Sequence, residues 1–131
     1  MDAITEDVFI GNVAAANDVE ALERCGVTHI ISLGCEPSNR LQGAEYLAFQ
    51  CILDTPETLI LGILNSTDRF ITAARAAHCR VLVHCVHGQS RSATVIISHL
   101  LSTGLPLEDC MRLMSERHAS TCINPGFLSQ L

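Results

Sequence analysis

Four runs of apolar and β-branched residues, each bounded by turn-forming residues, predict four β-strands. Residues 80–84 form the most apolar run, which is typical of a strand buried on both faces. The run at residues 27–33 is also mostly apolar, and Gly34 ends it. The other two strands are predicted at residues 8–10 and 46–53.

Between the strands, apolar residues recur with the 3.6-residue period of an amphipathic helix. The longest stripe predicts a helix that begins near Pro56 and ends near Ala77. Shorter helices are predicted after Asn17 or Asp18 through Arg24, at residues 92–102, at residues 107–118 and from Asn124 onward. The last segment has no stop signal, so we expect the chain either to be trimmed there or to end on a docked helix.

Strands that alternate with helices indicate an α/β fold with a largely buried central sheet. The chain has 131 residues, which is room for one domain of ordinary size. A chain of this length buries roughly two-thirds of its unfolded surface and needs no disulfide or metal to be stable. We therefore expect a single domain over residues 1–131, with a core from about residue 6 onward.

The composition argues against nucleic-acid and membrane binding. The net charge is −6 and no run rich in Lys or Arg occurs, whereas nucleic-acid backbones bind proteins through such residues. Four Phe, one Tyr and no Trp leave few side chains for stacking on single-stranded bases. No apolar run approaches the ~20 residues that span a bilayer. We expect no stable nucleic-acid partner and no membrane association.

Seven cysteines are the unusual part of the composition. Their spacing matches no C-x-x-C or zinc-ribbon pattern, and their number is odd. The first residues are acidic, unlike a secretory signal. A reducing compartment, cytoplasmic or nuclear, fits best, with most of the cysteines acting as small buried hydrophobic residues.

One cysteine differs, because Cys85 follows a buried strand and precedes a predicted helix by a short loop. The N–H groups of such a loop and the positive end of the helix dipole converge on one point, which binds a tetrahedral oxyanion and favours thiolate over thiol. Arg91 lies six positions further on and can hold two phosphoryl oxygens. Gly88 permits a backbone conformation closed to other residues, and Ser92 can hydrogen-bond the sulfur. The alternative is a structural cysteine buried before a helix cap at Ser90, but Cys, Gly, Arg and Ser at fixed offsets between a strand and a helix favour the oxyanion site.

The segment His84-Cys85-x-x-Gly88-x-x-Arg91-Ser92 resembles the signature of cysteine-dependent protein phosphatases, and Ser90-Arg91-Ser92 is similar to its dual-specificity branch. The resemblance extends along the chain, from residues 8–12 and 27–33 to Asn124, Phe127, Gln130 and Leu131. It implies a mixed sheet with helices on both faces and hydrolysis of phosphotyrosine and phosphoserine/threonine on proteins. The chain departs from the family's pattern at His87 and Ile123.

The resemblance also implies roles for individual residues. Cys85 is the nucleophile, Arg91 and the loop residues hold the phosphoryl group, Ser92 assists the thiolate, and His84 and Asn124 support the site. The loop residues are Val86, His87, Gly88, Gln89 and Ser90. No metal and no cofactor is expected, because Arg91 and the loop dipoles supply the positive charge.

Asp54 is the candidate general acid, because it lies 31 residues before Cys85, between the third strand and the long helix. The family resemblance places its acid at this position. Asp54 and Glu57 also fit a helix capping box, and Glu57 is the alternative acid. The other histidines, at positions 29, 78, 99 and 118, have no partner at a metal-binding spacing and are interpreted as structural or exposed.

Other functions stay open at this stage. An RNA 5′-phosphate end or a phosphoinositide could replace the protein substrate, although the loop has no lysine and the chain is acidic. Rhodanese-like and arsenate-reducing enzymes also use a cysteine in an anion-binding loop. A catalytically inactive phospho-binding module would belong to a different class, but Cys85, Arg91 and Asp54 are all present. The sequence does not indicate the oligomeric state.

Overall fold

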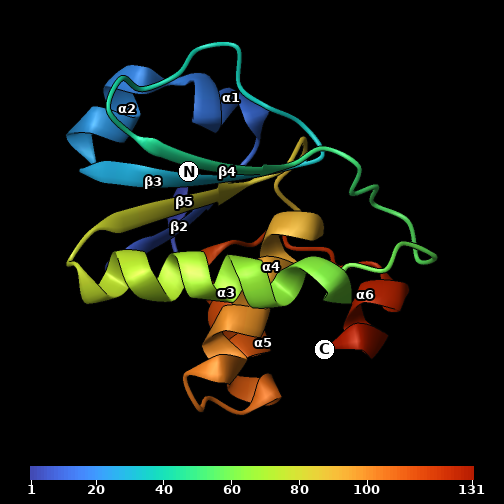
Figure 1. The fold of residues 1–131 in the computed structure, drawn as a ribbon. Helices are drawn as coiled ribbons and strands as arrows, with labels where there is room; N and C mark the ends of the chain where they lie inside the picture. Colours follow the sequence, from blue (N-terminus) through green and yellow to red (C-terminus); the bar gives the residue numbers. More distant parts are fainter.

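A five-stranded sheet forms the centre of the computed structural model, which describes residues 1–131 (Figure 1). The strand order is β1-β2-β5-β3-β4. β1 is antiparallel to β2 and the other neighbours are parallel, so the sheet is mixed, as the family resemblance implied. The strands are β1 (Asp2–Ala3), β2 (Val8–Gly11), β3 (Val27–Leu33), β4 (Glu45–Phe49) and β5 (Arg80–His84).

β5 occupies the middle of the sheet, between β2 and β3. Val81, Leu82 and Val83 are fully buried, because helices cover both faces of this strand. The apolar run predicted this environment correctly. Since β2, β5 and β3 are parallel, their carboxyl ends lie at one edge of the sheet, and β5 ends there at His84.

Helices cover the two faces unequally (Figure 1). One face carries two short helices over a small core, and the other face carries α3 and α4 over the main core of 20 buried residues. None of the helices combines the length and the apolar character needed to cross a membrane. The helices are α1 (Val13–Asn17), α2 (Val19–Arg24), α3 (Leu61–Ala76), α4 (Arg91–Ser102), α5 (Leu107–Arg117) and α6 (Pro125–Gln130).

Two predicted elements have different limits in the structure, and two were missed. The third strand ends at Phe49 rather than near residue 53, and α3 begins at Leu61 rather than near Pro56. An irregular segment, residues 50–60, therefore separates them. α1 was missed because it has five residues, too few for a periodic pattern, although Asn12 caps it by accepting from the Ala15 N–H at 2.9 Å. The two-residue strand β1 also went unpredicted.

The interpretation of the other cysteines as buried was largely wrong. Besides Cys85, only Cys110 is buried, whereas Cys51 and Cys122 are exposed and the remaining three are half-buried. All seven are free thiols. Cysteine content alone says little about burial, because a small side chain is tolerated at the surface as well as in the core.

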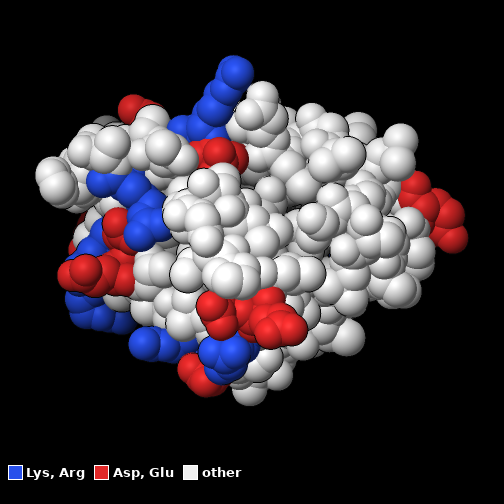
Figure 2. All heavy atoms as spheres, turned by 90° about the horizontal axis from the view of Figure 1, so that it is seen from below, with Lys and Arg blue, Asp and Glu red and all other residues white.

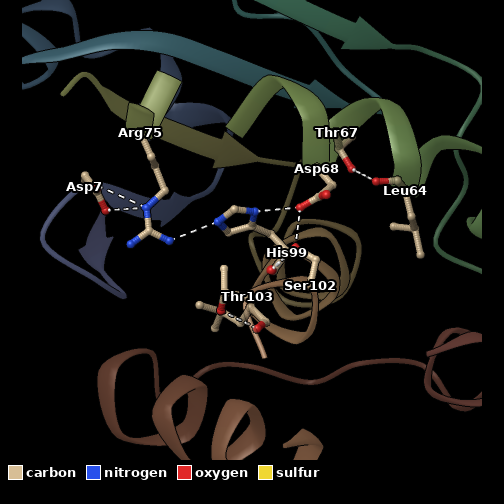
Figure 3. Close-up of polar contacts among 9 residues, drawn as sticks. Asp7, Leu64, Thr67, Asp68, Arg75, His99, Ser102 and Thr103 are labelled. Carbon is tan, nitrogen blue, oxygen red and sulfur yellow. Dashed lines mark hydrogen bonds and ion pairs between the residues drawn. The ribbon is translucent and has the colours of Figure 1, made fainter. Parts of the chain in front are cut away.

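A chain of polar contacts joins the segment before β2 to α3 and α4 (Figure 3). Arg75 Nε lies 3.1 Å from the Asp7 carboxylate, and its Nη1 donates to His99 Nε2 at 3.0 Å. His99 Nδ1 then donates to Asp68 at 2.8 Å, so the ring is neutral with its proton on Nδ1. The His99 side chain is buried, and the Asp68 carboxylate that it contacts is partly exposed.

We expect His99→Ala to lower the free energy of unfolding by about 2–3 kcal/mol, because it leaves Arg75 and Asp68 without their shared partner and opens a cavity. Urea titration followed by circular dichroism measures this change. Arg112→Ala, which removes the exposed ion pair with Asp109, should cost less than about 0.5 kcal/mol. Equal losses in the two variants would contradict a structural role for the network.

Candidate active site

Residues 85–90 form the loop between β5 and α4, which we call the phosphate loop. Cys85, the first residue after β5, is buried, with 1% of its surface exposed. Its Sγ accepts the Gly88 N–H at 3.2 Å and lies 3.3 Å from Ser92 Oγ in the first turn of α4. The loop thus wraps around the sulfur, and the helix begins directly beside it.

The surroundings of Cys85 stabilise its thiolate. Burial on its own raises the pKa of the Cys85 thiol. The hydrogen bonds from the Ser92 hydroxyl and from the N–H groups of Ser92 and Gly88, together with the charge of Arg91, outweigh burial and lower the pKa below the ordinary value. The thiolate is the nucleophilic form of cysteine, so this environment prepares Cys85 for attack.

Donors from outside the loop bind its carbonyl groups. Because the N–H and C=O of one peptide group point in opposite directions, each carbonyl held outward turns the next N–H inward. Val13 N–H, Cys122 N–H and Thr94 N–H donate to the carbonyls of Val86, Gln89 and Ser90 at 3.2, 3.0 and 2.9 Å, and His118 contacts the carbonyl of Gly88 at 2.6 Å. The interior of the loop is therefore lined by donors, as an oxyanion site requires.

Gly88 is the point where the phosphate loop passes closest to β2. Its φ of +68° lies in the left-handed region, and a Cβ there would lie 2.8 Å from the Gly11 carbonyl oxygen. Only glycine meets both conditions. The sequence motif predicted a backbone conformation at Gly88 that other residues avoid, and the structure agrees. The close packing on β2 is a second reason why this position requires glycine.

Arg91 is the first residue of α4 and is buried, with 7% of its surface exposed. Its Nη1 donates to the Ile52 carbonyl at 2.8 Å. Its Nε, in contrast, is buried and has no hydrogen-bond partner. A buried, unpaired guanidinium N–H is costly unless a ligand completes it, and an oxyanion is the group that a guanidinium binds best.

Gly34 leaves space for the Arg91 guanidinium. From the sequence, Gly34 was predicted only to end the strand at residues 27–33. A Cβ at Gly34 would collide with the Arg91 guanidinium and lie 2.7 Å from the Ile52 carbonyl oxygen. Its φ of +74° also favours glycine. A glycine after a buried strand was the available signal, but its contact with Arg91 depends on a residue 57 positions away.

Asp54 lies in the irregular segment before α3 and is tied to the phosphate loop through Asn124. Asn124 Nδ2 donates to Asp54 Oδ1 at 2.8 Å, and the Asn124 N–H donates to Ser90 Oγ at 3.0 Å. The capping-box interpretation was wrong, because Ile60 is the N-cap of α3 and neither Asp54 nor Glu57 binds its first N–H groups. Glu57 is exposed and makes no hydrogen bond.

The C-terminal helix α6 holds the segment that carries Asp54 (Figure 1). The backbone at Gly126 packs so closely on Pro56 that a Cβ there would collide with it. Gln130 donates to the Thr58 carbonyl at 2.9 Å and accepts the Leu61 N–H at 3.0 Å. The last residues of the sequence thus fix the position of the segment that carries the candidate acid.

Two histidines flank the loop in different ways. His84 is buried and its Nε2 lies 2.6 Å from Ser32 Oγ. Burial lowers the pKa of His84 to about 4, against an opposing hydrogen bond with the backbone of Cys85, so the ring is neutral near pH 7. His87 is exposed and makes no hydrogen bond. His84 therefore has a supporting position, while His87 faces solvent at the edge of the loop.

Cys35, on the segment after β3, lies beside the loop, with its Sγ 3.9 Å from His84 Nδ1. Burial and the negative charge of Cys85 raise the pKa of the Cys35 thiol, which Arg91 partly offsets. No group of three or more His, Cys, Asp or Glu side chains is arranged to hold a metal ion.

The comparisons with known proteins agree with this geometry. The family model for the catalytic domain of dual specificity phosphatases matches residues 8–131. The chain belongs to this family. It is 35% identical over 134 residues to dual specificity protein phosphatase 22 of Xenopus tropicalis, and 35% identical over 125 residues to dual specificity protein phosphatase 19 of Mus musculus.

These alignments cover 100% and 95% of this chain but only 63% and 57% of those proteins, so the chain spans about three-fifths of the curated relatives it matches. Among solved structures, human DUSP28 superposes with a TM-score of 0.93 at 30% identity, over 99% of this chain and 92% of that one. The dual specificity phosphatase fold and the family resemblance predicted from the sequence are thereby confirmed.

We expect Gly34→Ala to reduce kcat/KM roughly 100-fold, because it displaces the Arg91 guanidinium, and removal of one such donor typically costs 10²–10³-fold. Turnover of an aryl phosphate measures the loss. Gly43→Ala is the matched control, since Gly43 also has a positive φ but nothing lies within 4 Å of a Cβ there. That variant should lose stability but keep its activity. Similar activity losses in both variants would contradict the role of Gly34.

We expect the thiolate of Cys85 to persist below the pH at which an ordinary cysteine is protonated, and Ser92→Ala to move its titration to higher pH, because that change removes a donor to the sulfur. The rate of iodoacetamide alkylation against pH, read by mass spectrometry of the Cys85 peptide, measures both effects. Alkylation of the exposed Cys122, measured in the same digest, gives the reactivity of an ordinary cysteine. Ser129→Ala removes a serine hydroxyl away from the sulfur and is the control substitution. An unchanged profile in Ser92→Ala would remove Ser92 from this role.

Proposed function

We propose that this protein hydrolyses phosphate monoesters on proteins, both phosphotyrosine and phosphoserine/threonine, through a cysteinyl-phosphate intermediate. The observation that carries the proposal is the pairing of a stabilised Cys85 thiolate, at the start of the phosphate loop, with the buried, unpartnered Nε of Arg91, directly after the end of the loop. A nucleophile surrounded by oxyanion donors is suited to attack a phosphoryl group. Membership of the dual specificity phosphatase family supports the same reaction.

The first step forms a bond between Cys85 Sγ and phosphorus while the bond from phosphorus to the ester oxygen breaks. Asp54 gives its proton to that leaving oxygen, and Arg91 with the inward N–H groups holds the remaining phosphoryl oxygens. Asn124 keeps the Asp54 carboxyl group near the loop through its hydrogen bond at 2.8 Å. The product of this step is a phosphocysteine and a free hydroxyl group.

In the second step a water molecule attacks phosphorus. Asp54, now a carboxylate, takes one proton of the water, and the phosphorus–sulfur bond breaks to release phosphate. The electron pair returns to Cys85 as a thiolate, which the Ser92 hydroxyl stabilises from 3.3 Å. The enzyme regains its starting state, so no further reactant is consumed.

The family supports a substrate range that includes short phosphorylated side chains. Dual specificity phosphatases act on phosphoserine and phosphothreonine as well as on the longer phosphotyrosine, and the model of their catalytic domain matches residues 8–131. The same range follows for this chain.

The charge distribution favours a protein substrate over a long RNA. All eight basic residues are arginines, and most of the face in Figure 2 is uncharged, with arginines interleaved with acidic side chains rather than gathered in one basic patch. The named relatives are protein phosphatases as well. RNA ends and phosphoinositides are therefore the weaker alternatives.

We expect Cys85→Ser to lose at least about 10³-fold in turnover of phosphopeptides, and Asp54→Asn to lose roughly 100-fold, because they remove the nucleophile and the proton donor. Phosphate release from phosphotyrosine and phosphothreonine peptides, a phosphoinositide and triphosphate-ended RNA measures rate and substrate class together. Cys122→Ser and Glu57→Gln are the matched controls and should keep the original activity.

Three outcomes would contradict the proposal. An inert wild-type chain that still binds phosphopeptides would indicate a phospho-binding module. Faster release from the lipid or the RNA would assign a different substrate. Full turnover by Asp54→Asn with a loss in Glu57→Gln would transfer the acid role to Glu57.

A further inference from the structure

His118, at the C-terminal end of α5, contacts the phosphate loop. From the sequence, it was interpreted only as structural or exposed. The residue is buried, and its ring lies between two oxygens on different elements. Nδ1 is 2.6 Å from the Asp2 carboxylate on β1, and Nε2 is 2.6 Å from the Gly88 carbonyl oxygen. Ser120 Oγ also lies 3.1 Å from Nε2.

The two short contacts determine the proton count of the ring. A carboxylate and a backbone carbonyl accept hydrogen bonds and donate none. Both ring nitrogens must therefore carry a proton, which makes the ring an imidazolium. A neutral ring would place a nitrogen lone pair against an oxygen lone pair at 2.6 Å on one side or the other.

We propose that His118, held as an imidazolium by Asp2, is a positioning residue for the phosphate loop, and that oxyanion binding and turnover depend on its hydrogen bond to the Gly88 carbonyl. This hydrogen bond turns the N–H of Gln89, which belongs to the same peptide group, toward the phosphate position. Removal of the ring removes that hydrogen bond and releases the peptide.

This peptide group differs from its neighbours in two respects. The carbonyls of Val86, Gln89 and Ser90 are held by backbone N–H groups, which do not titrate, whereas the donor to Gly88 is a titratable side chain. Gly88 also has no Cβ, and its φ of +68° shows that its backbone uses the freedom of glycine. The peptide group that a side chain holds is thus also the one that rotates most easily.

The charged surroundings of the ring are simple. Asp2, from β1, is the one charged side chain in contact with it, and Ser120 is the other polar side chain. Glu116 and Arg117 on α5 are exposed and make no polar contact with the ring. The phosphate loop presents the Gly88 carbonyl, and the Cys85 sulfur lies beyond it, bound to the N–H of Gly88.

The first test measures the ring itself. We expect the ¹⁵N shifts of His118 to report two protonated nitrogens at pH 7. Asp2→Asn, which keeps an acceptor but removes the charge, should change these shifts, and Glu6→Gln, also acidic and exposed near the N-terminus, should not. A ring with one proton at pH 7 overturns the proposal whatever the enzyme does.

The second test measures the loop without turnover, through the affinity for tungstate, a dianion. His118→Leu, which removes the donor to the Gly88 carbonyl, should bind about tenfold more weakly at pH 7, as expected for one net hydrogen bond to a charged group. His118→Arg, which keeps a positive charge and several donors, should restore the affinity to near the wild-type level.

The kinetic readout rests on the proposed phosphatase function, so the two can fail separately. Tungstate affinity that follows His118 in a chain without phosphatase activity would support the positioning role and overturn the proposed function. Active enzyme in which tungstate affinity and kcat/KM are the same in wild type, His118→Leu and Asp2→Asn would do the opposite. If His118→Leu fails to fold, the arginine and asparagine variants still decide between these outcomes.

Discussion

The direction of the peptide groups in the phosphate loop is the constraint on which the candidate site depends. In this loop of six residues, the N–H dipoles converge on the inner side and repel one another. Hydrogen bonds to the carbonyls on the outer side hold the peptide groups in that direction. The Cys85 sulfur benefits from this arrangement, because the donors around it outweigh the effect of burial and lower the pKa of its thiol. Four donors from the surrounding structure bind the outer carbonyls.

The fold brings these donors together from segments that are distant in sequence. Parallel strands end at a common edge of the sheet, so the connections after β2 and β5 meet there. Val13 comes from the start of α1, and His118 and Cys122 come from the end of α5 and the connection that follows. Each covers a different carbonyl of the loop. Loss of one donor therefore affects one peptide group and leaves the remainder of the loop anchored.

The candidate catalytic groups outside the loop follow a similar principle. Arg91 reaches over Gly34 to the Ile52 carbonyl, which couples its position to the irregular segment before α3. Asp54 lies two residues further along that segment, and α6 holds it through Asn124 and Gln130. The guanidinium and the candidate acid are thus placed by the same stretch of chain.

The sequence by itself determined the α/β class, the central strands and the loop with its cysteine, glycine and arginine, because periodicity and short spacing are local properties of a chain. Only the tertiary structure decided what those residues touch. The contacts of Gly34 with Arg91 and of Asp2 with His118 join residues far apart in the chain, so no local pattern predicts them. The exposure of Cys51 and Cys122 was likewise misjudged from residue type. The residue type also does not give the hydrogen-bond partners of a buried histidine, because those partners come from the fold. His84 and His99 are neutral, whereas His118 lies between two acceptors.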